Sequence, residues 1–251
     1  MDRQNGIQAL ASEAGGNPDM TTSFQYLQPK LTPELTGYLA VHELRFAFTL
    51  DLVRRHTQGS VLDIGPHIFT AILRHEFSGR IDTLGFKVPA YEELIRPRSG
   101  ETHHEYDLHE ACRPPWPVIG PYGTVISAEV VEHLYVHPQY WLGFFHHLLV
   151  PGGKLILTTP NAANIRRRFT LLAGVHPFEM IGLDPKWGSH FREYTRSEVL
   201  HWAEKTGFKL QAYYARSHMC PPGRFNRALW AASNLLPPGL RQGMYFVFSK
   251  P

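Results

Sequence analysis

Short apolar runs alternate with amphipathic segments along most of the chain. The apolar runs are rich in β-branched residues and stop at Gly, Pro or a polar residue, which predicts buried strands. The segments between them repeat apolar residues at helical spacing. Strands separated by helices indicate an α/β fold with a mostly parallel sheet covered by helices on both faces. The four clearest apolar runs are SVLDIG, RIDTLGF, YGTVISAE and GKLILTTPN.

The regions that flank this alternation suggest the domain organisation. Residues 1–30 are rich in Gly, Asn, Ser and Gln without a sustained period, which predicts a flexible tail or a loosely docked arm. Thr32 is a candidate cap and Pro33 suits a first helical turn, so a helix is predicted from there to about Gly59. We therefore expect one domain over residues 31–251, in which this helix forms an N-terminal cap.

Two later segments carry further expectations. An amphipathic helix interrupted by Pro138 is predicted over EHLYVHPQYWLGFFHHLLV. In the last third, a helix over RFNRALWAASNLL presents an apolar stripe that we expect to pack in the core or against a second copy, rather than on a membrane. The stripe consists of Phe225, Leu229, Trp230, Leu235 and Leu236.

Composition excludes several classes of protein. The chain has 251 residues, 43% of them hydrophobic and 19% charged, which is typical of a globular domain rather than a disordered or fibrous chain. We find no apolar run long enough to span a bilayer and no secretory signal in the polar first twenty residues. Two cysteines cannot build a disulfide framework, so a cytoplasmic location is expected. The net charge of +3 makes a nucleic-acid partner unlikely.

Candidate binding residues follow the predicted strands. Ligands of open α/β sheets bind at the carboxyl ends of the strands. Gly65 lets the main chain approach a ligand there, and the amides of the following helix point to the same place. This arrangement suits a nucleoside-type cofactor, although a glycine at such a turn also has a purely structural interpretation.

Five motifs in order give a more specific indication: VLDIG at 61–65, YDLHEA at 106–111, VISAEVVEHL at 125–134, LLVPGGKLILTTPN at 148–161 and HFREYTRSEVLHWAEKTGFKL at 190–210. Together they resemble the class I S-adenosylmethionine-dependent methyltransferases, in particular a bacterial group that O-methylates sugars and polysaccharides. The resemblance implies a Rossmann-like seven-stranded sheet and an S-adenosylmethionine site. The residues it assigns to that site are Asp63, Gly65, Pro66, His67, Asp107, Leu108 and Ala128.

The chain departs from that family at two positions. His67 stands where a second glycine is usual, and it either contacts the cofactor or caps the following helix. At the end of the second strand, Gly85 and Phe86 occupy the place of the acid that normally holds the ribose, and Asp82 is expected to lie too early in the strand. Ribose recognition must then be supplied elsewhere, be weaker, or be absent.

The sequence EVVEH supplies a possible metal site. Glu129 is predicted at a strand end, with Glu132 and His133 just beyond it, and His190 lies in the later SHFREYTR motif. Two carboxylates with imidazoles suit Mg²⁺ or Mn²⁺. The pattern is similar to that of metal-dependent ubiquinone-pathway O-methyltransferases and small-RNA 2′-O-methyltransferases. The alternative is a structural role or proton transfer, in which His133 and Glu129 act as catalytic residues without a metal.

These observations predict an O-methyltransferase acting on a hydroxyl of a small molecule or a saccharide, and a homodimer is compatible with them. Two alternatives remain: a non-catalytic binding protein with the same fold, and an RNA 2′-O-methyltransferase. An acceptor-covering insertion is expected near residues 162–189. Within it, Arg166, Arg167 and Arg168 form a solvated face or contact a phosphate or acidic sugar.

Overall fold

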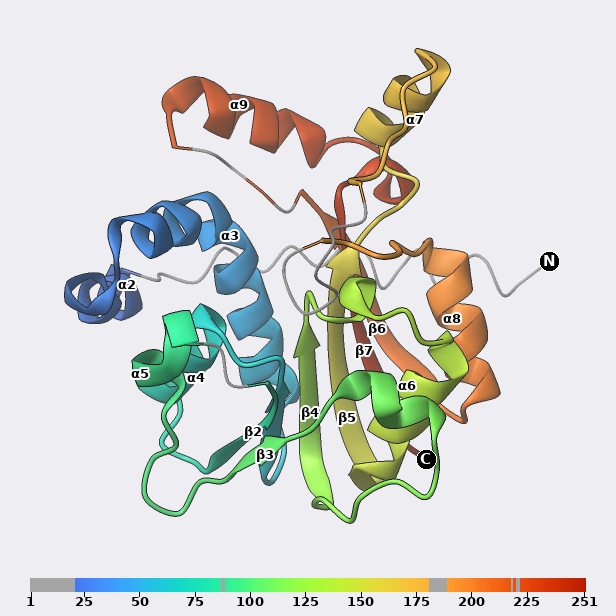
Figure 1. Ribbon diagram of the computed structural model, residues 1–251. Coiled ribbons are helices and arrows are strands. Elements are labelled where there is room, and N and C mark those ends of the chain that lie inside the picture. The colour runs from blue at the N-terminus through green and yellow to red at the C-terminus, as the bar shows by residue number, and fades with distance from the viewer. Residues whose placement is uncertain (1–20, 87–88, 181–188, 218, 220–221) are drawn as a thin grey trace.

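A seven-stranded sheet in the order β3-β2-β1-β4-β5-β7-β6 forms the centre of the structure (Figure 1). Strands β1 to β5 pair in parallel, whereas β7 pairs antiparallel with β5 on one side and with β6 on the other. This confirms the predicted fold class. The strands are β1 Val61–Ile64, β2 Ile81–Gly85, β3 His103–Glu105, β4 Tyr122–Ala128, β5 Leu149–Pro160, β6 Lys209–Arg216 and β7 Gly243–Ser249.

The structure is a computed structural model that describes residues 21–86, 89–180, 189–217, 219 and 222–251. Its helices are α2 Thr21–Leu27, α3 Pro33–His56, α4 Ile68–Glu76, α5 Glu92–Ile95, α6 Pro138–His147, α7 Ile165–Leu172, α8 Arg196–Lys205 and α9 Arg224–Ser233. Short 3₁₀ helices are η1 Gln28–Lys30, η2 Pro89–Tyr91, η3 Leu108–Cys112, η4 Val131–His133 and η5 Pro238–Leu240. Over the described ranges, each helix is too short or too polar to cross a bilayer.

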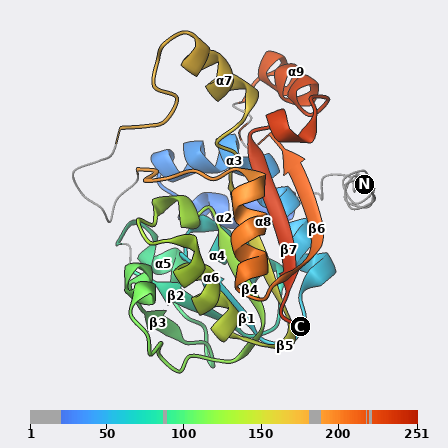
Figure 2. The ribbon, with the colours of Figure 1, turned by 90° about the vertical axis from the view of Figure 1, so that its right-hand side faces the viewer.

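Helices cover the sheet on both faces, so the core has two halves. Helices α2, α3, α4 and α5 lie on one face, and α6 and α8 lie on the other (Figures 1 and 2). Successive residues of a strand enter opposite halves, as Val125 and Ile126 of β4 do. Because both faces are buried, the strands lack polar alternation, which explains why they appear in the sequence as continuous apolar runs.

The predicted flexible tail is wrong for residues 21–30, which form α2 and η1. Leu27 is fully buried, and the Ser23 hydroxyl bonds to Nδ1 of His75 at 3.1 Å and to Glu76. These contacts attach α2 to the end of α4. They join positions far apart in the sequence, which local composition does not register. The rest of the predicted tail, residues 1–20, lies outside the described residues.

Two predicted helices differ from the structure. Pro138 does not interrupt a helix but is the first residue of α6, a position at which the main-chain N–H that proline lacks would make no hydrogen bond within the helix. The residues before it form η4 and a loop. Helix α9 buries no residue, so its stripe is not part of the core. The sequence correctly indicated an amphipathic helix there, but a stripe of this kind does not reveal what covers it.

Candidate functional site

A pocket of about 770 Å³ opens at the carboxyl ends of the central strands. Its wall includes ten of the eleven site residues predicted from the sequence: Gly65, Pro66, His67, Asp107, Leu108, Ala128, Glu129, Glu132, His133 and His190. The exception is Asp63, which lies behind the wall and is 1% exposed. One end of the pocket is formed mainly by main-chain turns, and we call it the turn end. The other holds the carboxylates and imidazoles, and we call it the charged end.

The turn end depends on the tight bend at Gly65, whose φ is 73°. A Cβ atom at this position would lie 2.6 Å from Cγ2 of Val130, so no side chain fits without displacing the neighbouring loop. Gly85, at the end of β2, packs against the same bend, because its Cβ position is 3.2 Å from Cδ of Pro66. Two strand ends therefore approach each other closely enough for main chain to form the pocket wall.

Asp63 supports this bend from inside the sheet. Its Oδ2 accepts a 2.6 Å hydrogen bond from Thr70 in the first turn of α4, while Oδ1 is buried without a partner among the described residues. Burial raises the pKa of Asp63 to about 7, despite the hydrogen bond from Thr70 and the charge of Arg74. Asp63 thus ties β1 to α4 and keeps one oxygen available to a buried polar group.

His67 occupies the N-cap position of α4 and also lines the pocket. Its side chain makes no capping hydrogen bond; Nδ1 lies 3.2 Å from the carbonyl oxygen of Gly65. Burial and the nearby charge of Arg45 lower the pKa of His67 to about 3, so its imidazole is neutral at physiological pH. The imidazole holds the bend and contributes to the wall where the family usually has a glycine.

The far side of the turn end is formed after β3. Oδ1 of Asp107 accepts hydrogen bonds from the main-chain N–H and from Nδ1 of His109, at 3.0 and 2.7 Å. The ring of His109 in turn stacks on Tyr135, with centroids 3.8 Å apart. At the end of β2 the wall consists of Gly85 and Phe86, and Asp82 lies at the other end of that strand, bonded to Arg80 and Tyr122. The expected absence of a strand-end acid here agrees with the described structure.

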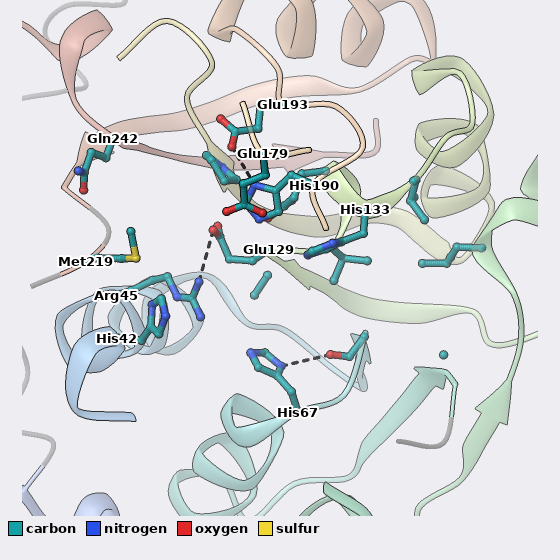
Figure 3. A pocket seen from close by; sticks show the side chains of 18 of the residues that line it. His42, Arg45, His67, Glu129, His133, Glu179, His190, Glu193, Met219 and Gln242 are labelled. Carbon is teal, nitrogen blue, oxygen red and sulfur yellow. Dashed lines mark hydrogen bonds and ion pairs between the residues drawn. The ribbon is translucent and has the colours of Figure 1, made fainter. Parts of the chain in front are cut away.

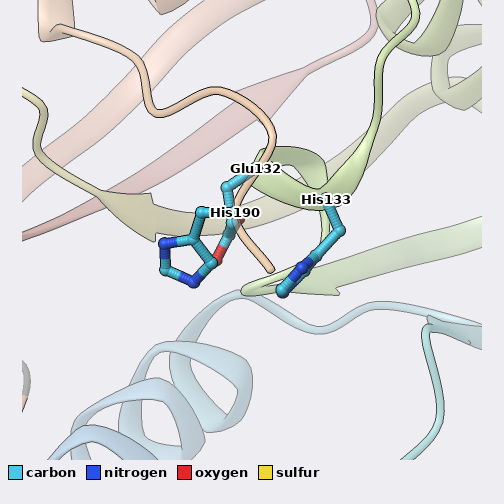
Figure 4. A group of neighbouring side chains, drawn as sticks. All are labelled: Glu132, His133 and His190. Carbon is cyan, nitrogen blue, oxygen red and sulfur yellow. The ribbon is translucent and has the colours of Figure 1, made fainter. Parts of the chain in front are cut away.

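The charged end contains a group suited to a cation. One ligand atom from each of Glu132, His133 and His190 lies within 4.8 Å of the others (Figure 4). Residues far apart in the chain meet here because the main-chain N–H groups of Phe191 and Arg192 donate to the carbonyl of Glu132, at 2.8 and 3.0 Å. We call these three side chains the Glu-His-His group.

Each member of the Glu-His-His group is oriented by a second hydrogen bond. Nδ1 of His133 lies 3.0 Å from the carbonyl oxygen of Ser189, and Nδ1 of His190 lies 2.8 Å from Oε1 of Glu193. Both contacts require an Nδ1–H donor, which leaves each Nε2 with its lone pair. Oε2 of Glu132 accepts from the Thr159 hydroxyl at 3.1 Å, and its Oε1 is buried without a partner among the described residues. Such outer hydrogen bonds are typical of metal-ligating histidines.

Electrostatics at the charged end reflect burial and crowding of charge. Burial and the nearby carboxylate of Glu129 raise the pKa of Glu132 well above its ordinary value. Burial lowers the pKa of His133. Burial would also lower that of His190, but the hydrogen bond and charge of Glu193 outweigh it and raise the pKa. Burial disfavours the charged form of the Glu132 carboxyl group, and a cation bound beside it would stabilise that charged form.

Glu129, which the sequence placed with these ligands, is turned to other partners. It is the one non-glycine residue of the described ranges with a positive φ, at 58°. Oε1 accepts a 2.7 Å hydrogen bond from Thr158, and Oε2 lies 3.4 Å from a guanidinium nitrogen of Arg45. Figure 3 shows this pair on the side of the pocket that faces α3. The structure thus brings three of the four predicted ligands together, with the fourth beside them.

Three charged residues of the pocket were not found from the sequence. Arg45 is 5% exposed and also donates to the Tyr38 hydroxyl at 2.9 Å. Glu193 accepts from His190 and Arg167, and Glu179 lines the same side (Figure 3). Arg45 could have been found from the sequence, because it is the only basic residue within the apolar stretch LRFAFTL. A lone cation on a buried helix face needs a partner.

The arginines of the predicted insertion divide between the pocket and solvent. Arg166 and Arg167 line the pocket, and Arg167 forms an ion pair with Glu193. Arg168 is exposed and donates to the carbonyl of Ala163 at 2.7 Å. Part of the insertion, residues 181–188, lies outside the described residues.

Comparison with known proteins identifies the fold. The family model described as "Methyltransferase domain" matches residues 37–213. A SAM-dependent methyltransferase from Archaeoglobus fulgidus has a TM-score of 0.55 at 14% identity, covering 83% of this chain and 94% of the other. A putative methyltransferase from Bacillus halodurans has a TM-score of 0.54 at 12% identity, covering 82% and 98%. The [4+2]-cyclase SpnF has a TM-score of 0.57 at 12% identity, covering 95% and 97%.

No curated protein matches this chain. The structural similarities lie far below the identity at which they would indicate more than a shared fold, and one of these relatives is called a cyclase. The chemistry has to be argued from the residues of the pocket.

Proposed function

The chain belongs to the methyltransferase domain family, and from this premise we propose that it transfers a methyl group from S-adenosylmethionine to a hydroxyl, with a divalent cation held by the Glu-His-His group. The observation that carries the proposal is the orientation of Glu132, His133 and His190. All three are held by outer hydrogen bonds, and each has a ligand atom available to the same space.

The turn end fits the cofactor. The absence of a Cβ atom at Gly65 leaves space at this wall, and one oxygen of Asp63 behind it is buried without a partner among the residues that the structure describes. The start of α4, at Pro66 and His67, lines the same wall, and a helix N-terminus favours a carboxylate such as that of an amino acid. Asp107 and Leu108, opposite, would contact the adenine. The cofactor supplies an electrophilic methyl group on a cationic sulfur.

The charged end fits the acceptor and a cation. Glu132 provides one carboxylate, and His133 and His190 provide two Nε2 atoms, a mixed oxygen and nitrogen set that suits Mn²⁺ or Mg²⁺. A cation bound there supplies a Lewis acid that lowers the pKa of a coordinated hydroxyl. The chain then has to align the hydroxyl oxygen with the methyl group and exclude water, because methyl transfer is an in-line displacement that depends on positioning.

A proton must leave the hydroxyl, and the pocket offers two acceptors. Glu129 pairs with Arg45 and accepts a hydrogen bond from Thr158, so its carboxyl group is fixed beside the Glu-His-His group. We propose Glu129 as the proton acceptor when the cation is bound. Without a cation, the Nε2 atom of His133 is available and takes that role. The two routes differ in their need for metal, so chelation distinguishes them.

The first experiment is calorimetric titration with S-adenosylhomocysteine and, separately, with Mn²⁺ and Mg²⁺. We expect S-adenosylhomocysteine to bind in the micromolar range, and Glu132→Gln to weaken Mn²⁺ binding by about 100-fold with little effect on S-adenosylhomocysteine. Glu204→Gln is the matched control, since Glu204 is an exposed acid of α8 that does not line the pocket. The control variant should bind both ligands as the parent protein does.

Methyl transfer is then measured on a panel of hydroxylated acceptors, including saccharides. Activity that survives chelation but is lost in His133→Ala supports the metal-free route. Absence of S-adenosylhomocysteine binding under all metal conditions contradicts the proposal and favours a non-catalytic binding protein. The saccharide acceptor rests on the sequence resemblance, and the cytoplasmic location and homodimer stay predictions.

A further inference from the structure

Helices α7 and α9 leave an apolar surface uncovered at one end of the molecule. Both views place them beyond the carboxyl ends of the central strands, projecting from the body (Figures 1 and 2). Neither helix buries a residue in the part of the chain that the structure describes. Their large apolar side chains are mostly exposed, up to 82% for Leu172 and 75% for Phe225. We call this the rim surface: Phe169, Leu171, Leu172, Val175, Phe225, Leu229 and Leu235.

The helices are anchored through polar groups rather than through their apolar faces. Near β6, Nε1 of Trp230 donates to the carbonyl of Ser217 at 3.2 Å, and Oδ1 of Asn234 accepts from the N–H of Ser217 at 3.1 Å. In α7, Arg167 forms an ion pair with Glu193, which lies outside the helix. The exposed apolar side chains of both helices are therefore available to another surface.

Charge indicates what covers the rim surface. Exposed arginines accompany the apolar residues on both helices, at Arg166, Arg168, Arg224 and Arg227. The segments 161–178 and 222–251 contain no acidic residue. A two-fold contact with a second copy through this surface would place two patches against each other that both carry arginines and no acid, which is unfavourable. Exposed apolar residues among cations without acids are typical of helices that lie in the interface of an anionic bilayer.

We propose that the rim surface docks the protein on an anionic lipid surface, with α7 and α9 lying in the interface. The geometry connects docking to the pocket, because Arg166 and Thr170 of α7 and Met219, just before α9, line the pocket as well. A bilayer at the rim surface would therefore lie beside the mouth of the pocket. This proposal goes beyond the proposed function and does not depend on it.

The test is flotation of the full chain with vesicles of phosphatidylcholine, alone or mixed with phosphatidylglycerol. We expect binding to the mixed vesicles that weakens with salt, and little binding to phosphatidylcholine alone. The variant Leu172→Ser/Phe225→Ser, with one change on each helix, should lower the bound fraction about tenfold or more. The variant Arg224→Gln/Arg227→Gln should lower it severalfold and reduce the salt dependence.

The matched control is Val118→Ser. Val118 is 94% exposed, yet it precedes β4 at the opposite end of the sheet, so its loss should leave vesicle binding unchanged. Circular dichroism and thermal unfolding, measured on every variant, show whether it is folded, and S-adenosylhomocysteine binding is measured separately. If the parent protein binds vesicles but no cofactor product, the proposed function fails and the docking proposal stands.

Three outcomes would overturn the docking proposal. The first is equal binding by the Leu172→Ser/Phe225→Ser variant and the parent protein. The second is a dimer in solution that this variant dissociates, because a second copy would then cover the surface. The third is binding to a single-stranded RNA that needs Arg224 and Arg227 but not the apolar residues, with no binding to vesicles.

Discussion

The two ends of the pocket are built by different means. At the turn end, the wall is main chain, and its shape depends on a glycine bend that leaves no room for a Cβ beside Val130. At the charged end, the wall is made of side chains, each held by one hydrogen bond to a second group, as His190 is by Glu193. The turn end is therefore formed by the strand ends of the sheet itself, whereas the charged end is formed by side chains that extend from the segments beyond those strand ends.

This difference has a physical consequence for mutations. A change at the turn end disturbs packing between β1, β2 and the loop after β4, so it affects binding and stability together. A change at the charged end removes a ligand or its support and leaves the packing of the turn end intact, so it should affect metal binding but not cofactor binding. The predictions below test that separation.

The largest effect is expected for Gly65→Ala. The new Cβ would meet Val130 at 2.6 Å, and the positive φ disfavours any side chain, so we expect a loss of about 2–4 kcal/mol in the free energy of unfolding and no measurable S-adenosylhomocysteine binding. Urea denaturation and calorimetry measure both. Gly37→Ala is the control, because Gly37 lies in α3 with nothing within 4 Å and should tolerate alanine. Unchanged stability of Gly65→Ala would contradict the tight bend.

A smaller effect on stability is expected from pH acting on Asp63. The unfolded chain loses this proton near the ordinary pKa of 3.8, whereas the folded protein keeps it until about 7. The folded state therefore binds more protons over that range, and stability falls as pH rises through it, by on the order of 2 kcal/mol between pH 5 and pH 8. Asp63→Asn should remove this part of the slope in urea denaturation. An identical slope in the variant would show that Asp63 is ionised when buried.

At the charged end, Glu193→Gln should weaken Mn²⁺ binding about tenfold, since Glu193 orients His190 without belonging to the Glu-His-His group. S-adenosylhomocysteine binding should stay near the parent value, whereas loss of the buried ion pair with Arg167 should lower the free energy of unfolding. Glu204→Gln, on the exposed side of α8, is the control. A comparable loss of cofactor-product binding would mean that the two ends are not separable.

The smallest effect concerns His67. Because its pKa is lowered to about 3, the imidazole stays neutral and its ring signals should not titrate between pH 5 and pH 8 in NMR spectra. His67→Ala removes the contact with Gly65 and should weaken S-adenosylhomocysteine binding about threefold to tenfold, by the same factor at both pH values. A factor that changes with pH would show that His67 carries charge in the folded protein.

Much of the fold was predictable because its strands are buried on both sides. The runs that end at Gly65 and Ala128 required no knowledge of tertiary structure to identify as strands. The N-terminal segment was not predictable in the same way, because Leu27 and Ser23 are fixed by α4, about fifty residues later. The composition of a short segment does not predict contacts with residues that are distant in the sequence.

In the candidate site, too, residue types could be predicted from the sequence, but the pairing of the side chains could not. Glu132, His133 and His190 were found because their residue types and spacing suggest ligands, and the structure brings them together. Glu129 has the right type but is turned toward Arg45, a partner on a different helix. The pairing of Glu129 with Arg45 depends on how separate segments pack, so it does not follow from spacing in the sequence. The support of His190 by Glu193 joins residues only three positions apart, in a segment without regular helical structure where spacing alone does not predict a contact.

The order of the strands also affects how the chain folds during synthesis. Strand β7 lies between β5 and β6, although β6 is made first. The ribosome therefore releases β6 before its hydrogen-bonding neighbour exists, with the aromatic side chains of Tyr213 and Tyr214 still uncovered. That half of the sheet is complete only when β7 pairs with both β5 and β6. A translational pause after β6 and before β7 would therefore prolong the exposure of an unpaired, aggregation-prone strand edge.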